Sequence, residues 1–202
     1  MADSDQPSAA NALPVIDQEQ PSAISTFTKK IVLDYDVLRQ ITQGYRAAAH
    51  RIVLTIGSWD QFHIGHARYL ARAKERGDIL VAGVDSDRAI KKYKGEHRPL
   101  IPEDERMEIL CYLGFVDFVT LIDDVTERGA WKYGLVKKLK PHAFVAVQDS
   151  YPERQQRVIR RHCDELVVLP RQAENTSSSD LYRRLTRELP KVMELLDQRR
   201  TR

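Results

Sequence analysis

The sequence predicts an α/β fold in which a five-stranded, mostly parallel sheet carries helices on both faces. After residue 50, short apolar runs of strand length alternate with longer segments whose apolar residues recur at helical spacing. Such alternation is typical of βαβ units, which have right-handed crossovers and parallel strands. Polar or glycine-bearing stretches follow several of the apolar runs, and ligands on these sheets bind beyond the carboxyl ends of the strands. We therefore expect a functional site at those ends.

The chain of 202 residues suits one domain with extensions at both ends. We expect a disordered tail over residues 1–26, which are rich in Ala, Ser, Gln, Asp and Pro and have no long apolar run. An N-terminal helical extension over 27–50, the main domain over 51–188 and a helical, basic tail over 189–202 follow. The absence of basic residues before Lys29 excludes a secretory signal and disfavours a transit peptide, and no stretch is long enough to span a membrane.

The composition argues against several classes of function. The 32 basic and 29 acidic side chains nearly balance, so the net charge of +3 does not by itself predict nucleic-acid binding. Cys111 and Cys163 are too few for a disulfide framework or a four-ligand zinc site. We expect both to be reduced, partly buried thiols of a cytoplasmic protein, with neither a nucleic acid nor a membrane among its partners.

The apolar pattern also predicts the individual elements. A first helix is expected over 34–49, with Leu38 and Ile41 on its apolar face. Strands are expected over 52–56, 79–84, 115–121, 143–147 and 166–169. Helices are expected near 64–76, 103–113, 127–139 and 152–162, with a last helical region from about Ser178.

The most informative stretch runs from Thr55 to His66, from the first strand into the next helix. His63 and His66 lie three residues apart where that helix begins, and Gly65 between them lets a bulky ligand approach the backbone closely. Helix N-termini bind phosphate through unpaired N–H groups and the positive end of the helix dipole. The stretch therefore predicts a site for the phosphates of a nucleoside triphosphate. The structural alternative is a capped helix with two surface histidines.

Several basic residues follow the second strand. Lys91 and Lys92 are expected to be exposed, whereas Lys94 lies before Gly95 on a predicted loop that can close over a bound triphosphate. Arg106 follows acidic residues in the first turn of a helix. Pairing with those carboxylates and bidentate binding of substrate phosphate are both open for Arg106.

A run of four hydroxyl residues, Thr176 to Ser179, leads into the last helix. Helix N-capping needs only one hydroxyl. We therefore predict that Ser177, Ser178 and Ser179, together with the helix N–H groups, bind the β- and γ-phosphates. This helix would meet the histidine helix at the same edge of the sheet.

Several ordered motifs resemble those of the sugar-phosphate nucleotidyltransferases of the H-x-G-H superfamily, which implies a Rossmann-like fold. The motifs are Gly57-Ser58-Trp59-Asp60, His63-Ile64-Gly65-His66, Lys94-Gly95, Glu105-Arg106 and the serine run. From about Asp34 to Arg184 the chain looks most like the D-glycero-β-D-manno-heptose 1-phosphate adenylyltransferases and the related glycerol-phosphate cytidylyltransferases. The helix before the first strand resembles the heptose branch, whereas Pro170-Arg171 resembles the cytidylyl branch.

The resemblance implies roles for these residues. His63 and His66 stabilise charge on the α-phosphate while an oxygen of the acceptor phosphate attacks, and Lys94 balances charge on the triphosphate or the acceptor. Ser177, Ser178 and Ser179 bind the departing pyrophosphate. Arg106 is a candidate substrate-binding residue on the grounds given above, not through the resemblance. The nucleotide pocket is formed by Gly57, Ser58, Trp59 and Asp60. Further candidates for nucleotide binding are Gly65, Gln148, Asp149 and Arg171. A Mg²⁺ ion bound through the nucleotide and a homodimer are also implied.

The chain departs from the family pattern where the nucleotide base would bind. Trp59 replaces the usual phenylalanine, and Asn175 stands where a glycine is usual. Related enzymes have a glycine-bearing segment after the fourth strand that contacts the base. Here that segment reads Val147-Gln148-Asp149-Ser150-Tyr151, in which Gln148 could present an amide to the base. Base and acceptor therefore stay open.

The leading hypothesis is transfer of a nucleoside monophosphate from a triphosphate, with ATP favoured, to a sugar 1-phosphate such as a heptose phosphate, with release of pyrophosphate. One alternative is a CTP-dependent transferase acting on glycerol phosphate or a similar polyol phosphate. Another is a non-catalytic sensor, which binds nucleotide without turnover. Class I tRNA charging also uses an H-I-G-H sequence, but the chain is too short for an anticodon domain and lacks a convincing K-M-S-K-S loop.

Overall fold

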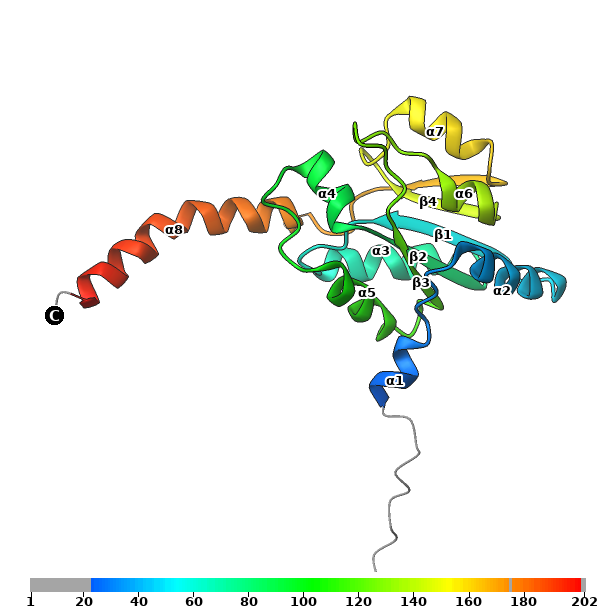
Figure 1. Ribbon diagram of the computed structural model, residues 1–202, viewed down its shortest axis with the longest axis horizontal. Helices are drawn as coiled ribbons and strands as arrows, with labels where there is room; N and C mark the ends of the chain where they lie inside the picture. The colour runs from blue at the N-terminus through cyan, green and yellow to red at the C-terminus, as the bar shows by residue number, and fades with distance from the viewer. Residues whose placement is uncertain (1–22, 175, 201–202) are drawn as a thin grey trace, which may run out of the picture.

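The structure, a computed structural model, describes residues 23–174 and 176–200. A five-stranded sheet has the order β3-β2-β1-β4-β5, and all four pairings are parallel (Figure 1). The strands are β1 (Ile52–Gly57), β2 (Ile79–Asp85), β3 (Phe118–Ile122), β4 (Ala143–Val147) and β5 (Glu165–Leu169). The helices are α1 (Ala23–Thr28), α2 (Tyr35–Ala47), α3 (Ile64–Lys74), α4 (Asp87–Lys94), α5 (Glu103–Cys111), α6 (Gly134–Leu139), α7 (Glu153–Arg160) and α8 (Ser178–Arg200). The predicted α/β fold is confirmed.

The two central strands, β1 and β2, supply side chains to a core on each face of the sheet. Val53 and Leu80 pack in one core, which α3 and α5 cover. Leu54 and Val81 pack in the other core, with side chains from α2, α6 and α7. Since neighbouring residues in a strand point to opposite faces, these apolar runs require helices on both sides of the sheet.

Two predicted segments within the domain differ from the structure. Residues 127–133 were predicted to be helical, but α6 begins only at Gly134. The segment before it folds into a turn with a bridge between Val125 and Trp131, and Tyr133 has a left-handed backbone with φ of 61°. Residues 87–94 form α4 and not the predicted loop, because Ser86 caps the helix by accepting a hydrogen bond from the Ala89 amide at 3.0 Å.

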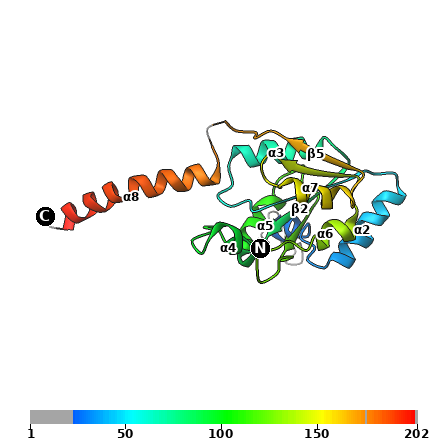
Figure 2. The ribbon, with the colours of Figure 1, turned by 90° about the horizontal axis from the view of Figure 1, so that it is seen from above.

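The ends of the chain also differ from the expected boundaries. Residues 23–26 belong to α1, and the rest of the expected disordered tail lies outside the described residues. α8 continues as one helix across the expected boundary at residue 188 and contains Pro190. Figures 1 and 2 both show α8 extending away from the sheet and its covering helices. Within the described part of the chain, no helix is both long and apolar enough to cross a membrane.

Candidate active site

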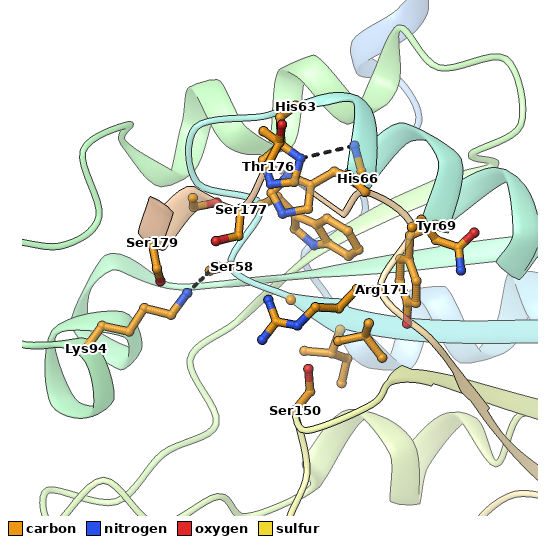
Figure 3. Close-up of a pocket in the computed structure, with 18 of the residues that line it drawn as sticks. Ser58, His63, His66, Tyr69, Lys94, Ser150, Arg171, Thr176, Ser177 and Ser179 are labelled. Atoms are coloured by element: carbon orange, nitrogen blue, oxygen red, sulfur yellow. Dashed lines mark hydrogen bonds between the residues drawn. The ribbon is translucent and has the colours of Figure 1, made fainter. Parts of the chain in front are cut away.

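A pocket of about 330 Å³ lies beyond the carboxyl ends of β1 and β4, where α3 and α8 begin (Figure 3). It brings His63 and His66 together with Ser177 and Ser179, which are more than 100 residues away along the chain. The remaining lining residues are Ile56, Gly57, Ser58, Trp59, Gly65, Tyr69, Lys94, Val147, Ser150, Tyr151, Arg171, Gln172, Ala173, Thr176 and Ser178. The lining residues include cationic Lys94 and Arg171, but neither aspartate nor glutamate. The pocket therefore suits an anion.

The two histidines lie at the first turn of α3. His63 is the N-cap residue, and its Nδ1 accepts a hydrogen bond from the Gly65 amide at 3.1 Å. In the neutral ring this leaves the proton on Nε2, which can donate to a ligand. The His63 and His66 rings stack with centroids 3.9 Å apart. A Cβ at Gly65 would lie 2.9 Å from the His63 ring and 3.0 Å from Cβ of Ala173, so only glycine fits without displacement.

Burial lowers the pKa of both histidines. The pKa of His66 falls to about 3, because burial disfavours the imidazolium and because His63 and Lys94 add positive charge. Burial alone lowers the pKa of His63. Nδ1 of His66 is buried and has no hydrogen-bond partner among the described residues. In the protein without ligand both rings are therefore neutral at pH 7, so each can offer an N–H donor to a ligand but carries no fixed positive charge.

Lys94 lies in the last turn of α4, and its Nζ donates to Oγ of Ser58 at 2.8 Å. Its pKa is lowered mainly by burial and then by the neighbouring charge of Arg98. Tyr93 anchors the same turn, since its hydroxyl donates to the Asp85 carboxylate at 2.5 Å. Lys94 therefore faces the pocket as predicted, but from a helix that is tied to the sheet and not from a flexible loop.

The hydroxyl residues before and within α8 have different structural tasks. Ser177 Oγ accepts from the Asp180 amide at 3.1 Å and donates to the Asp180 carboxylate at 2.6 Å, which is an N-cap arrangement. Ser178 Oγ is buried and donates to the main-chain oxygen of Asp60 at 2.6 Å. Ser179 and Thr176 line the pocket. The capping interpretation therefore holds for Ser177, whereas phosphate binding by the residues that line the pocket stays a prediction.

Asp60 does not line the pocket; it organises the chain around it. Its carboxylate is fully buried and accepts hydrogen bonds from Nε of Arg98 at 2.8 Å and from the amides of Leu100 and Ile101 at 3.1 Å. Both carboxylate oxygens therefore accept hydrogen bonds from the loop between α4 and α5. Asp60 therefore supports the nucleotide pocket expected at this position without facing it.

Arg106 also lies outside the pocket lining. Its side chain is almost completely buried, and its guanidinium donates to the Ile101 and Ser58 main-chain oxygens and to the Asp87 carboxylate, the last at 2.6 Å. Of the two roles that the sequence left open, the ion pair is the one observed. Its partner is Asp87 on α4 and not an acid in the first turn of α5.

Trp59 has a left-handed backbone with φ of 52°, and its indole N–H donates to the Gly83 main-chain oxygen at 2.8 Å. A Cβ at Gly57 would lie 3.1 Å from the indole, so the glycine makes room for this ring. Gln148 and Asp149 lie in the turn after β4, where Asp149 has φ of 68°, and neither lines the pocket. Ser150 from that segment lines it instead. Tyr69 and Gln172 line it as well, although no motif assigned them a role.

The geometry agrees with comparisons to known proteins. The family model described as cytidylyltransferase-like matches residues 54–185. Bifunctional protein HldE of Nitratiruptor is 34% identical over 137 residues, covering 68% of this chain and 29% of the relative. HldE of Campylobacter concisus is 43% identical over 99 residues, covering 49% of this chain and 20% of the relative. The chain thus spans less than a third of the length of these relatives.

Solved structures extend the comparison to the fold. A pantoate-beta-alanine ligase from Francisella tularensis has a TM-score of 0.50 at 14% identity, covering 75% of each chain, which supports the shared fold alone. A lipopolysaccharide core biosynthesis protein from Thermoplasma volcanium has a TM-score of 0.48 at 24% identity, covering 60% of this chain and 96% of that one. The family model covers more than half of the chain and all the converging pocket segments. The chain therefore belongs to the cytidylyltransferase-like family.

Proposed function

We propose that the protein is a nucleotidyltransferase that moves a nucleoside monophosphate from a triphosphate, with ATP favoured, to a phosphorylated sugar such as a heptose 1-phosphate. The observation that carries the proposal is the convergence of His63 and His66 with Ser177 and Ser179 around one pocket that has cationic but no acidic side chains. In the reaction, an acceptor phosphate oxygen bonds to the α-phosphorus, the bond to the β-phosphate oxygen breaks, and pyrophosphate leaves with the electron pair.

Each group near the reacting phosphates has a distinct task in this proposal. The imidazole N–H groups of His63 and His66 donate hydrogen bonds to the α-phosphate as negative charge shifts within it. Lys94 and Arg171 balance the charge of the phosphate chain, and Ser179 with the first turn of α8 binds the departing pyrophosphate. Preorganised donors of this kind lower a barrier by about 3 kcal/mol each. Ser177 and Ser178 keep that turn in place through their capping and tethering hydrogen bonds.

A Mg²⁺ ion is part of the proposal as a companion of the nucleotide. The pocket lining offers hydroxyls, imidazoles, cations and the Gln172 amide but no carboxylate, and the described residues contain no group of three or more His, Cys, Asp or Glu able to hold a metal. This donor set fits an ion bound by phosphate oxygens and water, which is how Mg²⁺ often binds. When bound, the ion neutralises phosphate charge and leaves the direct contacts to the protein donors.

The partners in the proposal are a nucleoside triphosphate, a phosphorylated small molecule and a second copy of the chain in a homodimer, with no nucleic acid. The two described cysteines are free, in keeping with the proposed cytoplasmic location. CTP with glycerol phosphate is the second candidate pair. It is favoured by Arg171, which follows a proline as in the cytidylyl branch and points into the pocket in Figure 3.

The direct test measures pyrophosphate release with ATP or CTP, Mg²⁺ and either heptose 1-phosphate or glycerol phosphate. We expect release with one pair, and a loss of about 100- to 1000-fold in kcat for His66→Asn. His50→Asn, at an exposed histidine remote from the pocket, is the matched control and should keep full activity. Nucleotide-dependent stabilisation without release for any pair would favour the sensor, whereas neither effect in folded protein would overturn both functions.

A further inference from the structure

The projecting helix α8 carries an unusual amount of exposed apolar surface. Leu185 is 61% exposed, Leu189 56%, Val192 47% and Met193 51%. The spacing of three to four residues places these side chains along one side of the helix. Because α8 extends away from the sheet in both views, this side joins neither of the cores that the described residues form (Figures 1 and 2).

Such a helix needs a partner surface to be stable in water. Helical segments in proteins derive most of their stability from packing of an apolar face, and isolated ones are marginal. Pro190 weakens α8 further, because a proline inside a helix removes one backbone hydrogen bond and crowds the preceding turn. Packing of the stripe formed by Leu185, Leu189, Val192 and Met193 therefore has to offset both costs.

The stripe leads into a hollow at the base of α8. This hollow has a volume of about 550 Å³ and lies between α5, the segment after β1 and the first turns of α8. Its apolar lining includes Trp59, Phe62, Ile101, Ile109, Leu181 and Leu185. Leu185 thus belongs to both the stripe and the hollow. One continuous surface has a convex helical part and a concave part, as required for packing against an identical copy about a two-fold axis.

The charges beside this surface are also complementary. On α5, the exposed or half-buried Asp104, Glu105 and Glu108 are acidic, whereas the first half of α8 carries Arg183, Arg184 and Arg187. Glu105 and Arg184 both line the hollow. Of the ion pairs formed by the described residues, none joins a carboxylate of α5 to an arginine of α8. Two copies arranged about a two-fold axis would bring these unlike charges together twice.

We propose that a second copy of this chain covers α8, with the stripe of each copy packed in the hollow of the other and Arg184 of each copy facing Glu105 of the other. The inference rests on the homodimer in the proposed function and adds the surface that forms it. Since Ser177 and Ser179 lie at the start of α8, the same contact fixes the helix that carries the proposed pyrophosphate site.

Sedimentation equilibrium of the full chain tests the surface. Wild type is expected to be a dimer, and Leu189→Glu should weaken dimerisation by at least about 100-fold, because each dimer loses two buried leucines. Val37→Glu changes an equally apolar residue that is 45% exposed on α2, and should leave the dimer unchanged. A wild-type monomer at about 100 μM, or a dimer that Leu189→Glu leaves intact, would overturn the inference.

A charge-exchange experiment identifies the contact between copies. Arg184→Glu and Glu105→Arg should each weaken self-association by about tenfold, because each creates two pairs of like charges. An equimolar mixture of the two variants should recover near wild-type association, since the mixed dimer has an opposite-charge pair at both contacts. Failure of the mixture to recover contradicts the pairing. Pyrophosphate release separates the two proposals: an inactive dimer counts only against the transferase activity, whereas an active monomer counts against this surface and the homodimer but not against the activity.

Discussion

Asp85→Asn should stabilise the protein at neutral pH. Asp85 ends β2 and is almost fully buried, Oδ2 accepts from the Tyr93 hydroxyl at 2.5 Å, and Oδ1 has no partner among the described residues. Burial raises its pKa from 3.8 to about 6, against the opposing effects of the Tyr93 hydrogen bond and the charges of Lys94 and Arg106. The carboxylate is therefore ionised at pH 7 in an environment that disfavours its charge.

The magnitude follows from linkage between protonation and folding. With a folded-state pKa above the unfolded one, the stabilising effect of the proton is complete below pH 3.8 and is lost as the pH rises through 6. The difference of 2.2 between 6 and 3.8, at about 1.4 kcal/mol per pKa unit, corresponds to about 3 kcal/mol at pH 7. Asparagine keeps an acceptor for Tyr93 and carries no charge, so it should recover much of this free energy.

Urea unfolding of both proteins between pH 4 and pH 8 measures the effect. The gain in unfolding free energy for Asp85→Asn should be near zero at pH 4 and reach about 2–3 kcal/mol at pH 8. Asp104→Asn, at an exposed carboxylate in the first turn of α5, is the matched control and should show no such rise. If Asp85→Asn is instead less stable than wild type at pH 8, the charge is stabilised by its neighbours and the reasoning fails.

Three other predictions concern the pocket. Lys94→Met should lower kcat/KM by about 100-fold, whereas Lys91→Met on the exposed side of α4 should not, as steady-state kinetics would show. The His66 imidazole resonances should not shift between pH 5 and pH 8 in NMR titrations, because its pKa is about 3; an inflection near pH 6.5 would contradict its burial. Gly57→Ala should cost about 1–3 kcal/mol in urea unfolding, since the new methyl group meets the Trp59 indole at 3.1 Å, and an unchanged midpoint would show that the ring can move.

The sequence pattern was most informative where function depends on neighbouring residues. His63 and His66 share one helical turn, so their spacing alone places both at the start of α3, and the strand pattern locates that turn at the edge of the sheet. The same logic placed Ser177 and Ser179 correctly relative to them. Alternation of strands and helices likewise gave the parallel sheet, because its apolar runs are nearly continuous.

The remaining features depend on contacts between distant segments. The guanidinium of Arg106 binds Asp87, 19 residues away, and no local pattern distinguishes this from phosphate binding. α4 was missed because its many lysines resemble an exposed loop, while the helix is anchored by Ser86 and by contacts of Tyr93 with β2. The error over 127–133 arose because Trp131 lies at helical spacing from Leu135 in the sequence, whereas in the structure it forms a bridge with Val125.

Asp60 forms hydrogen bonds with two segments beside the pocket, the loop after α4 and the start of α8. Its carboxylate positions the loop that holds Arg98, while its carbonyl oxygen receives the hydroxyl of Ser178, 118 residues further along the chain. A displacement of either segment is therefore transmitted to the other through Asp60, which lies just before the turn that carries His63 and His66. The hydrogen bond from Ser178 to the Asp60 carbonyl thus helps to fix the separation between the proposed phosphate donors on α3 and on α8.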